Sequence, residues 1–334
     1  MKLDRIFGSH MVFAAGLPIR IYGSGCGEGR VRFASQTVAV RSDSERWQVE
    51  LSAMSYGGPY ELIFESGGER VCFDDIYIGD VYMFSGQSNM QFKLKSSSTP
   101  PSEYRSLDRL RMFCTDRLES GEPYTADDGW NTLNADKAAD WSALAYLCGI
   151  ELASENVTIG IIACYQGASV IESWVPRRTF EDRGIIVPIE KRHSDHINTV
   201  YSRWNSDGFL YDYAVKQVIP YSLSGVVWYQ GESDSSVVEA NMYGRELEAM
   251  INVWRDAFCN RNLHFVVVQI ADFCYRNDDA WRAVQQAQLE TAQRVENVSC
   301  VISADVCEDN NIHPPTKDAL AHRIAIQLRS LWSR

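Results

Sequence analysis

Ser88 is the first residue of this chain whose type and setting suit covalent chemistry. It lies in the run Gly-Gln-Ser-Asn-Met at residues 86–90, directly after the apolar segment 80–84. A glycine near a serine at a strand end permits a tight turn that presents the hydroxyl above a sheet, where it can act as a nucleophile. The G-x-S-x-G elbow of α/β-hydrolases is absent, because Met90 stands where its second glycine would be. A polar turn without a catalytic role is the alternative.

Two further loops carry groups that can stabilise negative charge. Gly167 follows the apolar run 159–163, and a glycine there lets backbone N–H groups approach a reacting centre. Gln230 and Glu232 follow the apolar run 225–229. A side-chain amide can donate a hydrogen bond to an oxyanion, whereas an ionised carboxylate cannot. We therefore assign oxyanion donation to Gln230 and an orienting role to Glu232, with a surface turn as the alternative.

His313 is the candidate general base. It lies in the loop 309–314, just before a predicted closing helix over 318–331. An imidazole in a strand-end loop can accept the proton of a serine hydroxyl near neutral pH, so His313 is the expected partner of Ser88. A structural or solvated histidine is the alternative.

These loops are positioned by a regular alternation of apolar strand-like runs and amphipathic helical segments. The predicted strands cover 80–84, 157–163, 225–229, 265–270 and 298–302. The predicted helices cover 139–151, 237–258, 280–295 and 318–331. Buried strands that alternate with helices indicate a doubly wound α/β domain, in which ligands bind beyond the carboxyl ends of the strands.

The first part of the chain has a different pattern. Residues 1–78 contain short alternating segments separated by glycine-rich turns, which predicts a small antiparallel β-sandwich. We expect this domain to be followed by a catalytic domain over residues 79–334. Within it, residues 93–135 have little periodicity, and we interpret them as an insertion or lid.

Taken together, the motifs resemble those of the sialate O-acetylesterase group of SGNH hydrolases. The match comprises Gly-Gln-Ser-Asn-Met at 86–90, Gly167 with Ile-Glu-Ser-Trp at 171–174, Trp-Tyr-Gln-Gly-Glu-Ser at 228–233 and Ile-His-Pro at 312–314. These motifs occur in the family's order and extend over nearly all of residues 79–334.

The resemblance implies a flavodoxin-like three-layer α/β/α fold and metal-free hydrolysis of acetyl esters on sugars, without a cofactor. It implies Ser88 as the nucleophile and His313 as the base. The oxyanion hole would comprise the backbone N–H groups of Ser88 and Gly167 and the side chain of Gln230.

One departure from the family concerns the residue that orients the histidine. SGNH hydrolases usually carry an aspartate three residues before it, but Asn310 occupies this position. Glu232, the backbone carbonyl of Asn310, or Asp309 could take over this role. We favour Glu232 or the carbonyl and leave the two open.

The substrate is less well determined. Trp174 could stack on a sugar ring, with core packing as the alternative. Arg177, with Arg178, could bind the carboxylate of a sialic acid, with a solvated basic pair as the alternative. An acetylxylan or other hemicellulose acetylesterase and a non-catalytic carbohydrate-binding protein are the competing functions.

Composition limits the partners. The net charge of −12 disfavours nucleic acid and anionic membranes, so we expect an acetylated mono- or oligosaccharide as the partner. No signal peptide is evident at the start, and nine scattered cysteines suit a reducing compartment, so we expect a cytoplasmic protein. The sequence shows no metal-ligand cluster.

Overall fold

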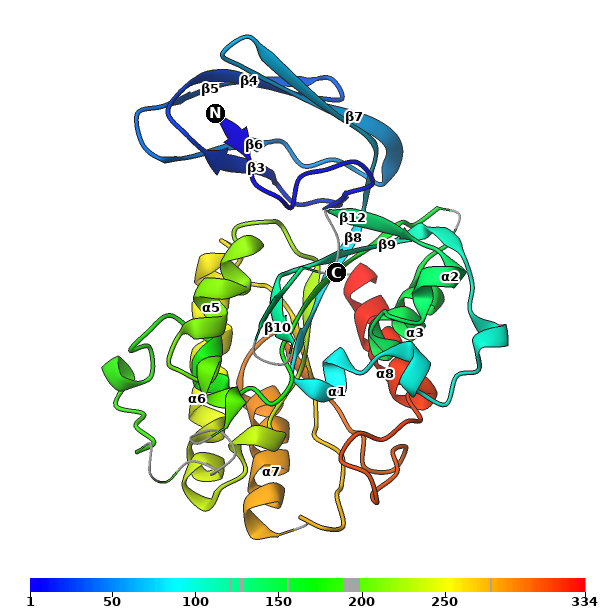
Figure 1. Cartoon of the computed structure of the whole chain (residues 1–334), viewed down its shortest axis with the longest axis vertical. Helices are drawn as coiled ribbons and strands as arrows, with labels where there is room; N and C mark the ends of the chain where they lie inside the picture. The colour runs from blue at the N-terminus through cyan, green and yellow to red at the C-terminus, as the bar shows by residue number, and fades with distance from the viewer. Residues whose placement is uncertain are drawn as a thin grey trace.

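A mixed sheet runs through the middle of the computed structural model, which describes residues 1–119, 122–125, 129–154, 156–188, 191, 199–276 and 278–333 (Figure 1). In spatial order its strands are β12 (Trp130–Leu133), β9 (Leu107–Cys114), β13 (Ile159–Tyr165), β8 (Glu69–Gly86), β14 (Gly225–Tyr229), β15 (Phe265–Val268) and β16 (Val298–Val301). Neighbours from β9 to β16 pair in parallel, and β12 pairs antiparallel with β9. The fold is therefore mixed α/β with a central mixed sheet.

The strands follow the apolar runs of the sequence. Every residue of β13 and β14 is buried, as expected for central parallel strands that are covered on both faces. The expected strand over 225–229 coincides with β14, and the other four expected strands are present with different end residues.

Helices cover both faces of the sheet. Their bounds are α1 (Ser88–Gln91), α2 (Ala135–Ala138), α3 (Ala143–Leu152), α5 (Phe209–Tyr213), α6 (Val237–Ala257), α7 (Asp279–Arg294) and α8 (Asp318–Arg329). Figure 1 shows α3 and α8 on one side of the sheet and α5 and α6 on the other, with α7 packed against α6. None of the described helices is long and apolar enough to cross a membrane.

Capping residues determine where the long helices begin. Helix α6 starts after Ser236, whose hydroxyl accepts from the N–H of Glu239 while the Glu239 carboxylate accepts from the N–H of Ser236. This capping box satisfies two N–H groups that the first helical turn leaves without partners. Helix α3 begins at Ala143 rather than at the expected residue 139, because Ser142 caps it.

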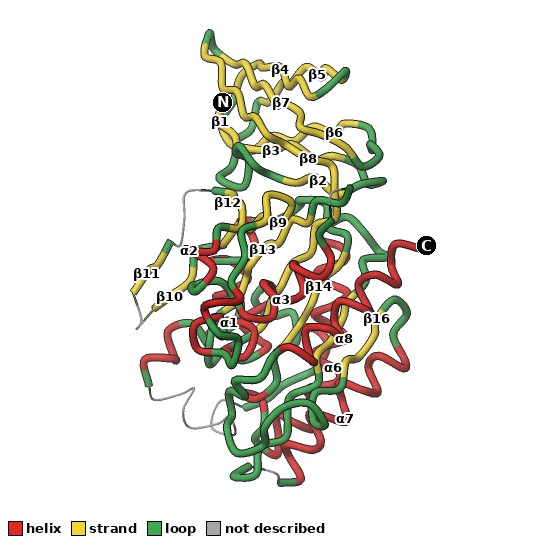
Figure 2. Tube along the Cα trace, turned by 90° about the vertical axis from the view of Figure 1, so that its right-hand side faces the viewer, coloured by secondary structure: helices red, strands yellow, loops and turns green. Residues whose placement is uncertain are grey.

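The N-terminal part consists of short strands that continue into the central sheet. These strands are β1 (Lys2–Leu3), β2 (Val12–Ala14), β3 (Ile19–Ser24), β4 (Gly27–Phe33), β5 (Gln36–Ser42), β6 (Arg46–Leu51) and β7 (Gly57–Ser66). Strands β1, β3 and β6 form one sheet. Strands β2 and β7 pair with the long strand β8, β4 pairs with β7, and β5 pairs with β4. Figure 2 shows β8 passing from this part into the central sheet. The boundary expected between residues 78 and 79 therefore falls inside one continuous strand, and the division into two domains stays a prediction.

The interpretation of residues 93–135 as an aperiodic insertion was wrong in part. Strands β9 and β12 belong to this stretch and extend the central sheet beyond β13. Polar residues in β9 hid the strand pattern, among them Arg111, whose buried guanidinium pairs with Asp75 at 2.9 Å. Strands β10 (Arg117–Glu119) and β11 (Glu122–Tyr124) form a separate hairpin, and residues 120, 121 and 126–128 lie outside the described chain.

Candidate active site

Ser88 lies directly beyond the carboxyl end of the central strand β8, as the first residue of α1. The turn between them depends on Gly86, whose φ is 135°. A Cβ at this position would lie 2.0 Å from the carbonyl oxygen of Tyr229, so no larger residue fits. The backbone N–H of Gln87 donates to the same carbonyl at 3.0 Å. The turn thus holds Ser88 above the junction of β8 and β14.

His313 reaches Ser88 from the loop that precedes α8. Its Nε2 lies 2.7 Å from the Oγ of Ser88, which is hydrogen-bond distance. The backbone N–H of His313 donates to the Oδ1 of Asn311 at 2.9 Å, and the ring of Phe92 stacks on the imidazole with centroids 6.3 Å apart. The structure therefore brings together the predicted nucleophile and the predicted base across 225 residues of sequence.

The environment of His313 favours its neutral form. Burial lowers the pKa of the imidazole, and the positive charge of the nearby Lys317 lowers it further. A neutral imidazole whose Nε2 accepts from the Ser88 hydroxyl carries its proton on Nδ1. This is the protonation state that a general base requires.

The predicted contact between Glu232 and the ring of His313 is absent. Instead, the Nδ2 of Asn89 donates to the Oε1 of Glu232 at 2.6 Å and to the backbone carbonyl of Ile312 at 2.9 Å. The ammonium of Lys317 donates to the Oδ1 of Asn89 at 2.8 Å. Glu232 therefore acts on the histidine loop through Asn89, and burial raises the pKa of its carboxyl.

The other two expected partners do not contact the ring either. Asp309 is exposed, and its backbone carbonyl accepts from the N–H of Cys274. Among the residues that the structure describes, neither Asp309 nor the carbonyl of Asn310 hydrogen-bonds to Nδ1 of His313. The described residues thus form a Ser–His pair in which no carboxylate contacts the ring.

Gly167 lies beside Ser88, just after β13. A Cβ on Gly167 would lie 3.6 Å from the Cβ of Ser88, so its backbone is close to the nucleophile. Its N–H donates to the Oε1 of Gln91 at 2.7 Å. No described residue accepts from the N–H of Ser88. The N–H groups of Ser88 and Gly167, which are expected to form the oxyanion hole, thus both lie close to the Ser88 hydroxyl. The N–H of Gly167 is bonded to Gln91.

Two side chains hold the Gly167 loop from behind. The indole N–H of Trp204 donates to the carbonyl of Gly167 at 3.0 Å, and the Nδ2 of Asn205 donates to the carbonyl of Ala168 at 2.8 Å. Both carbonyls therefore have a hydrogen-bond donor of their own, and these bonds fix the loop next to Ser88.

The expectation that Gln230 donates to the oxyanion is corrected by the structure. Its side chain is fully buried, and its Nε2 donates to the carbonyl of Ser169 at 2.9 Å and to the carboxylate of Asp234. Its Oε1 accepts from the hydroxyl of Tyr243 at 3.0 Å. An amide has two N–H donors, so none remains for a substrate. Gln230 instead connects the loop after β14 to Ser169 and Tyr243 by hydrogen bonds.

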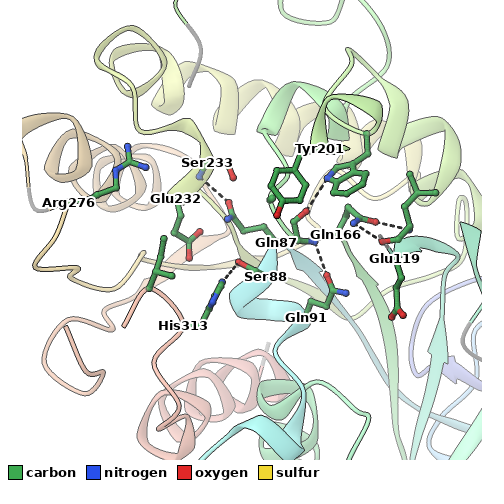
Figure 3. A pocket seen from close by; sticks show the side chains of 15 residues that line it. Gln87, Ser88, Gln91, Glu119, Gln166, Tyr201, Glu232, Ser233, Arg276 and His313 are labelled. Carbon is green, nitrogen blue, oxygen red and sulfur yellow. Dashed lines mark hydrogen bonds between the residues drawn. The ribbon is translucent and has the colours of Figure 1, made fainter. Parts of the chain in front are cut away.

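A cavity of about 530 Å³ opens above the Ser88–His313 pair (Figure 3). Its volume is within the range of small-molecule sites. Besides Ser88, Gly167, Glu232 and His313, its walls include Gln87, Gln91, Leu118, Glu119, Gln166, Ala168, Tyr201, Trp204, Ser233, Arg276 and Ile312.

The two residues predicted to bind substrate do not line this cavity. Trp174 is fully buried, packs edge-on against Trp228 at 5.7 Å and donates its indole N–H to the Oγ of Ser169. The side chain of Arg177 is 70% exposed and lies 3.9 Å from a carboxylate oxygen of Asp212. Core packing thus explains Trp174, and a solvated ion pair explains Arg177.

The sequence interpretation missed several residues that line the cavity. The rings of Tyr201 and Trp204 lie 5.4 Å apart on one wall, in a stretch without a recognisable motif. Gln166 exchanges two hydrogen bonds with the backbone of Leu118, which holds β10 at the cavity. Arg276 enters from the loop between β15 and α7. Of these, only Gln166, which follows a predicted strand, carried a sequence signal.

Comparison with known proteins agrees with the motifs. Residues 78–328 match the family model described as carbohydrate esterase, sialic acid-specific acetylesterase. The chain is 26% identical to a sialate O-acetylesterase of Pongo abelii and 25% identical to one of Homo sapiens, with 91% of this chain aligned in each case. It spans 64% of the length of each of these relatives.

The fold also has a solved counterpart. A carbohydrate acetylesterase from Xanthomonas citri superposes with a TM-score of 0.85 at 24% identity, covering 100% of this chain and 76% of that one. The match to the family model confirms the family predicted from the motifs. The chain belongs to the sialic acid-specific acetylesterase family of carbohydrate esterases.

Proposed function

We propose that this protein is a serine esterase that removes O-acetyl groups from acetylated sugars, with acetylated sialic acid as its substrate. The observation that carries the proposal is the 2.7 Å contact between the Ser88 Oγ and the His313 Nε2 at the base of a sugar-sized cavity. Membership of the family and the similarity to sialate O-acetylesterases support the choice of ester and sugar.

The first half of the reaction acylates Ser88. His313 takes the hydroxyl proton on Nε2 while Oγ attacks the acetyl carbonyl carbon, which gives a tetrahedral intermediate. When this intermediate collapses, the bond from carbon to the sugar oxygen breaks, and His313 returns the proton to that oxygen. The sugar leaves and the acetyl group remains on Ser88.

The oxyanion is stabilised by the backbone N–H groups of Ser88 and Gly167. Donors aimed at the developing charge are worth about 3 kcal/mol each in comparable sites. Gly167 becomes available when the carbonyl oxygen of the substrate displaces Gln91 from its N–H. Gln91 is at the end of the short helix α1, so its side chain can rotate without moving a strand.

The second half of the reaction regenerates the enzyme. A water molecule gives a proton to His313 and attacks the acetyl carbon, and the same two backbone donors stabilise the new oxyanion. Collapse breaks the bond from carbon to the Ser88 oxygen, returns the proton from His313 to that oxygen and releases acetic acid, which ionises to acetate in solvent. The proton is exchanged between Oγ, Nε2 and the water, and the chain supplies every group needed.

The finer description of the fold is part of this proposal. Without β9, which extends the parallel part of the sheet beyond β13, the strands β13, β8, β14, β15 and β16 occupy the spatial order 2-1-3-4-5 when numbered along the chain, which is the flavodoxin-like order. This order supports a three-layer SGNH-hydrolase domain. The ring of Trp47 in β6 stacks on Phe64 in β7 at 5.0 Å, which supports a β-sandwich for the N-terminal part.

Acetate release from a panel of acetylated sugars tests the function. The panel contains 9-O-acetylated sialic acid, acetylated xylo-oligosaccharide and a small chromogenic acetate, and is run with the wild type, Ser88→Ala and His313→Ala. We expect release from acetylated sialic acid that both substitutions reduce by at least about a thousandfold.

The other outcomes identify what is wrong. Serine-dependent release from the xylo-oligosaccharide alone would indicate a hemicellulose acetylesterase. Wild-type activity in Ser88→Ala would contradict the mechanism. No release from any substrate would favour a non-catalytic carbohydrate-binding protein.

A further inference from the structure

Arg276 is a cation in the wall of the active-site cavity that the Ser–His mechanism does not use. One of its guanidinium nitrogens, Nη2, donates to the backbone carbonyl of Ser235 at 3.3 Å. The guanidinium carbon lies 5.6 Å from the ring centroid of Trp281, within the range of a cation–π contact. These two contacts hold the head group in place and leave most of its five N–H donors unused.

Within the part of the chain that the structure describes, no carboxylate pairs with Arg276. The arginines first considered for substrate binding differ in this respect, because Arg177 faces Asp212 and Arg178 pairs with Glu181 at 3.2 Å. Of these three, only Arg276 lines the cavity and lacks an acidic partner.

The two acidic residues in the cavity wall have partners of their own. Glu119 forms an ion pair with Arg117 at 2.7 Å. Glu232 accepts from Asn89, and burial raises the pKa of its carboxyl. Neither acid therefore offsets the charge of Arg276, which remains available for an anionic group of a ligand.

Figure 3 shows where this charge lies relative to the chemistry. Arg276 is on the side of Ser88 that carries Glu232 and Ser233, whereas Gln91, Gln166 and Glu119 are on the opposite side. A ligand whose ester is at Ser88 can therefore extend toward Arg276 without passing over the Gly167 loop.

We infer that Arg276 binds the carboxylate of an acidic sugar whose acetyl ester is placed at Ser88. The contact is a charge-assisted hydrogen bond, which a planar guanidinium can make through two N–H groups at once. The substrate class is therefore an O-acetylated sugar acid rather than a neutral acetylated sugar. This inference rests on the esterase function proposed above and adds the residue that selects the substrate.

The test compares a substrate with and without its negative charge. The substrates are 9-O-acetylated sialic acid and the methyl ester of its carboxylate, which differ at the group that Arg276 is inferred to bind. The enzymes are the wild type, Arg276→Gln and the matched control Arg177→Gln, which removes an exposed arginine outside the cavity. Circular dichroism and the urea-unfolding midpoint report whether each variant is folded.

The expected result is a change in the ratio of kcat/KM for the acid to kcat/KM for the methyl ester. In Arg276→Gln, kcat/KM for the acid divided by kcat/KM for the methyl ester falls by about 10- to 100-fold, the usual effect of losing a charge-assisted hydrogen bond. In Arg177→Gln the ratio stays at the wild-type value. Added salt weakens the preference of the wild type for the acid and has a smaller effect on Arg276→Gln.

Two results would overturn the inference, and they are distinguishable. If the wild type hydrolyses the sugar esters but the ratio is the same in Arg276→Gln, the assignment of Arg276 fails and the esterase function stands. If the wild type releases acetate from no sugar ester, the proposed function and the inference fail together.

Discussion

The side-chain oxygen of Gln91 accepts a hydrogen bond of 2.7 Å from the backbone N–H of Gly167, the donor that the proposed mechanism assigns to the oxyanion. In the proposed mechanism the same N–H donates to the carbonyl oxygen of the substrate, so the amide oxygen of Gln91 competes with that oxygen for the donor. Any substrate that uses this donor must first displace Gln91. The displaced hydrogen bond between neutral groups costs about 1 kcal/mol.

This relationship predicts opposite effects for two substitutions of Gln91. Gln91→Ala removes the competing acceptor, so kcat/KM for a chromogenic acetate should rise about fivefold. Gln91→Glu places a stronger, negatively charged acceptor beside the developing oxyanion, so kcat/KM should fall by at least about tenfold. Steady-state kinetics of both variants provide the measurement. A tenfold loss in Gln91→Ala would mean that the Gln91 amide assists the reaction.

The orientation of His313 leads to a second prediction. Because no described carboxylate contacts its ring, Asp309→Asn should change kcat by less than about twofold. Glu232→Gln retains an oxygen that can accept from Asn89, so kcat of this variant should fall by less than about tenfold. His313→Ala, measured in parallel, should lose at least about a thousandfold. A loss in Glu232→Gln as large as that in His313→Ala would instead establish a catalytic triad.

The pH profile of the reaction should reflect the environment of His313. Burial and the charge of Lys317 lower its pKa, so the neutral base persists at lower pH and the acid limb of kcat/KM lies below that of an ordinary histidine. Lys317→Met removes the positive charge, raises the pKa of His313 and should move the acid limb to higher pH. Lys216→Met, an exposed lysine paired with Asp212, is the control. An acid limb that stays in place in Lys317→Met would exclude this charge effect.

Asp80, a buried carboxyl inside β8 where this strand begins to pair with β13, should make stability depend on pH. Burial raises the pKa of Asp80 from 3.8 to about 6, although its side chain accepts from the hydroxyl of Tyr56 at 3.2 Å. The native state therefore binds a proton more tightly than the unfolded chain, so this contribution is complete below about pH 4 and is lost as the pH rises through about 6.

Asp80→Asn should remove the loss of stability that accompanies ionisation of Asp80. Between pH 4 and pH 7 the free energy of unfolding should decline by about 2 to 3 kcal/mol less in the variant than in the wild type. Urea unfolding at several pH values measures the difference, with the exposed Asp43→Asn as the control. Parallel pH curves for Asp80→Asn and the wild type would contradict the expected raised pKa.

Much of the fold and the core of the candidate site could be predicted from sequence. The strands β13 and β14 are continuous apolar runs, which is the pattern of strands buried on both faces. Once a parallel sheet was inferred, Ser88 and His313 were expected at the same edge of it, because loops after parallel strands gather there. Their contact at 2.7 Å agrees with that reasoning.

Elements whose pattern mixes polar and apolar residues were harder to predict. Strand β9 contains Arg111, whose charge is neutralised by Asp75, a residue far away in the sequence. Helix and strand periodicity report burial only when buried residues are apolar, so a buried ion pair hides the strand. This explains why residues 93–135 were interpreted as an insertion.

The sequence by itself determined the family and the alternation of strands and helices, and it predicted the nucleophile and the base, because short motifs at strand ends carry them. Tertiary structure alone decided which polar side chains face the cavity. Gln230 donates to Ser169 and Asp234, while Gln91 and Arg276 line the cavity wall. The direction of a side chain depends on the partners that distant segments bring to it, and no local pattern encodes those partners.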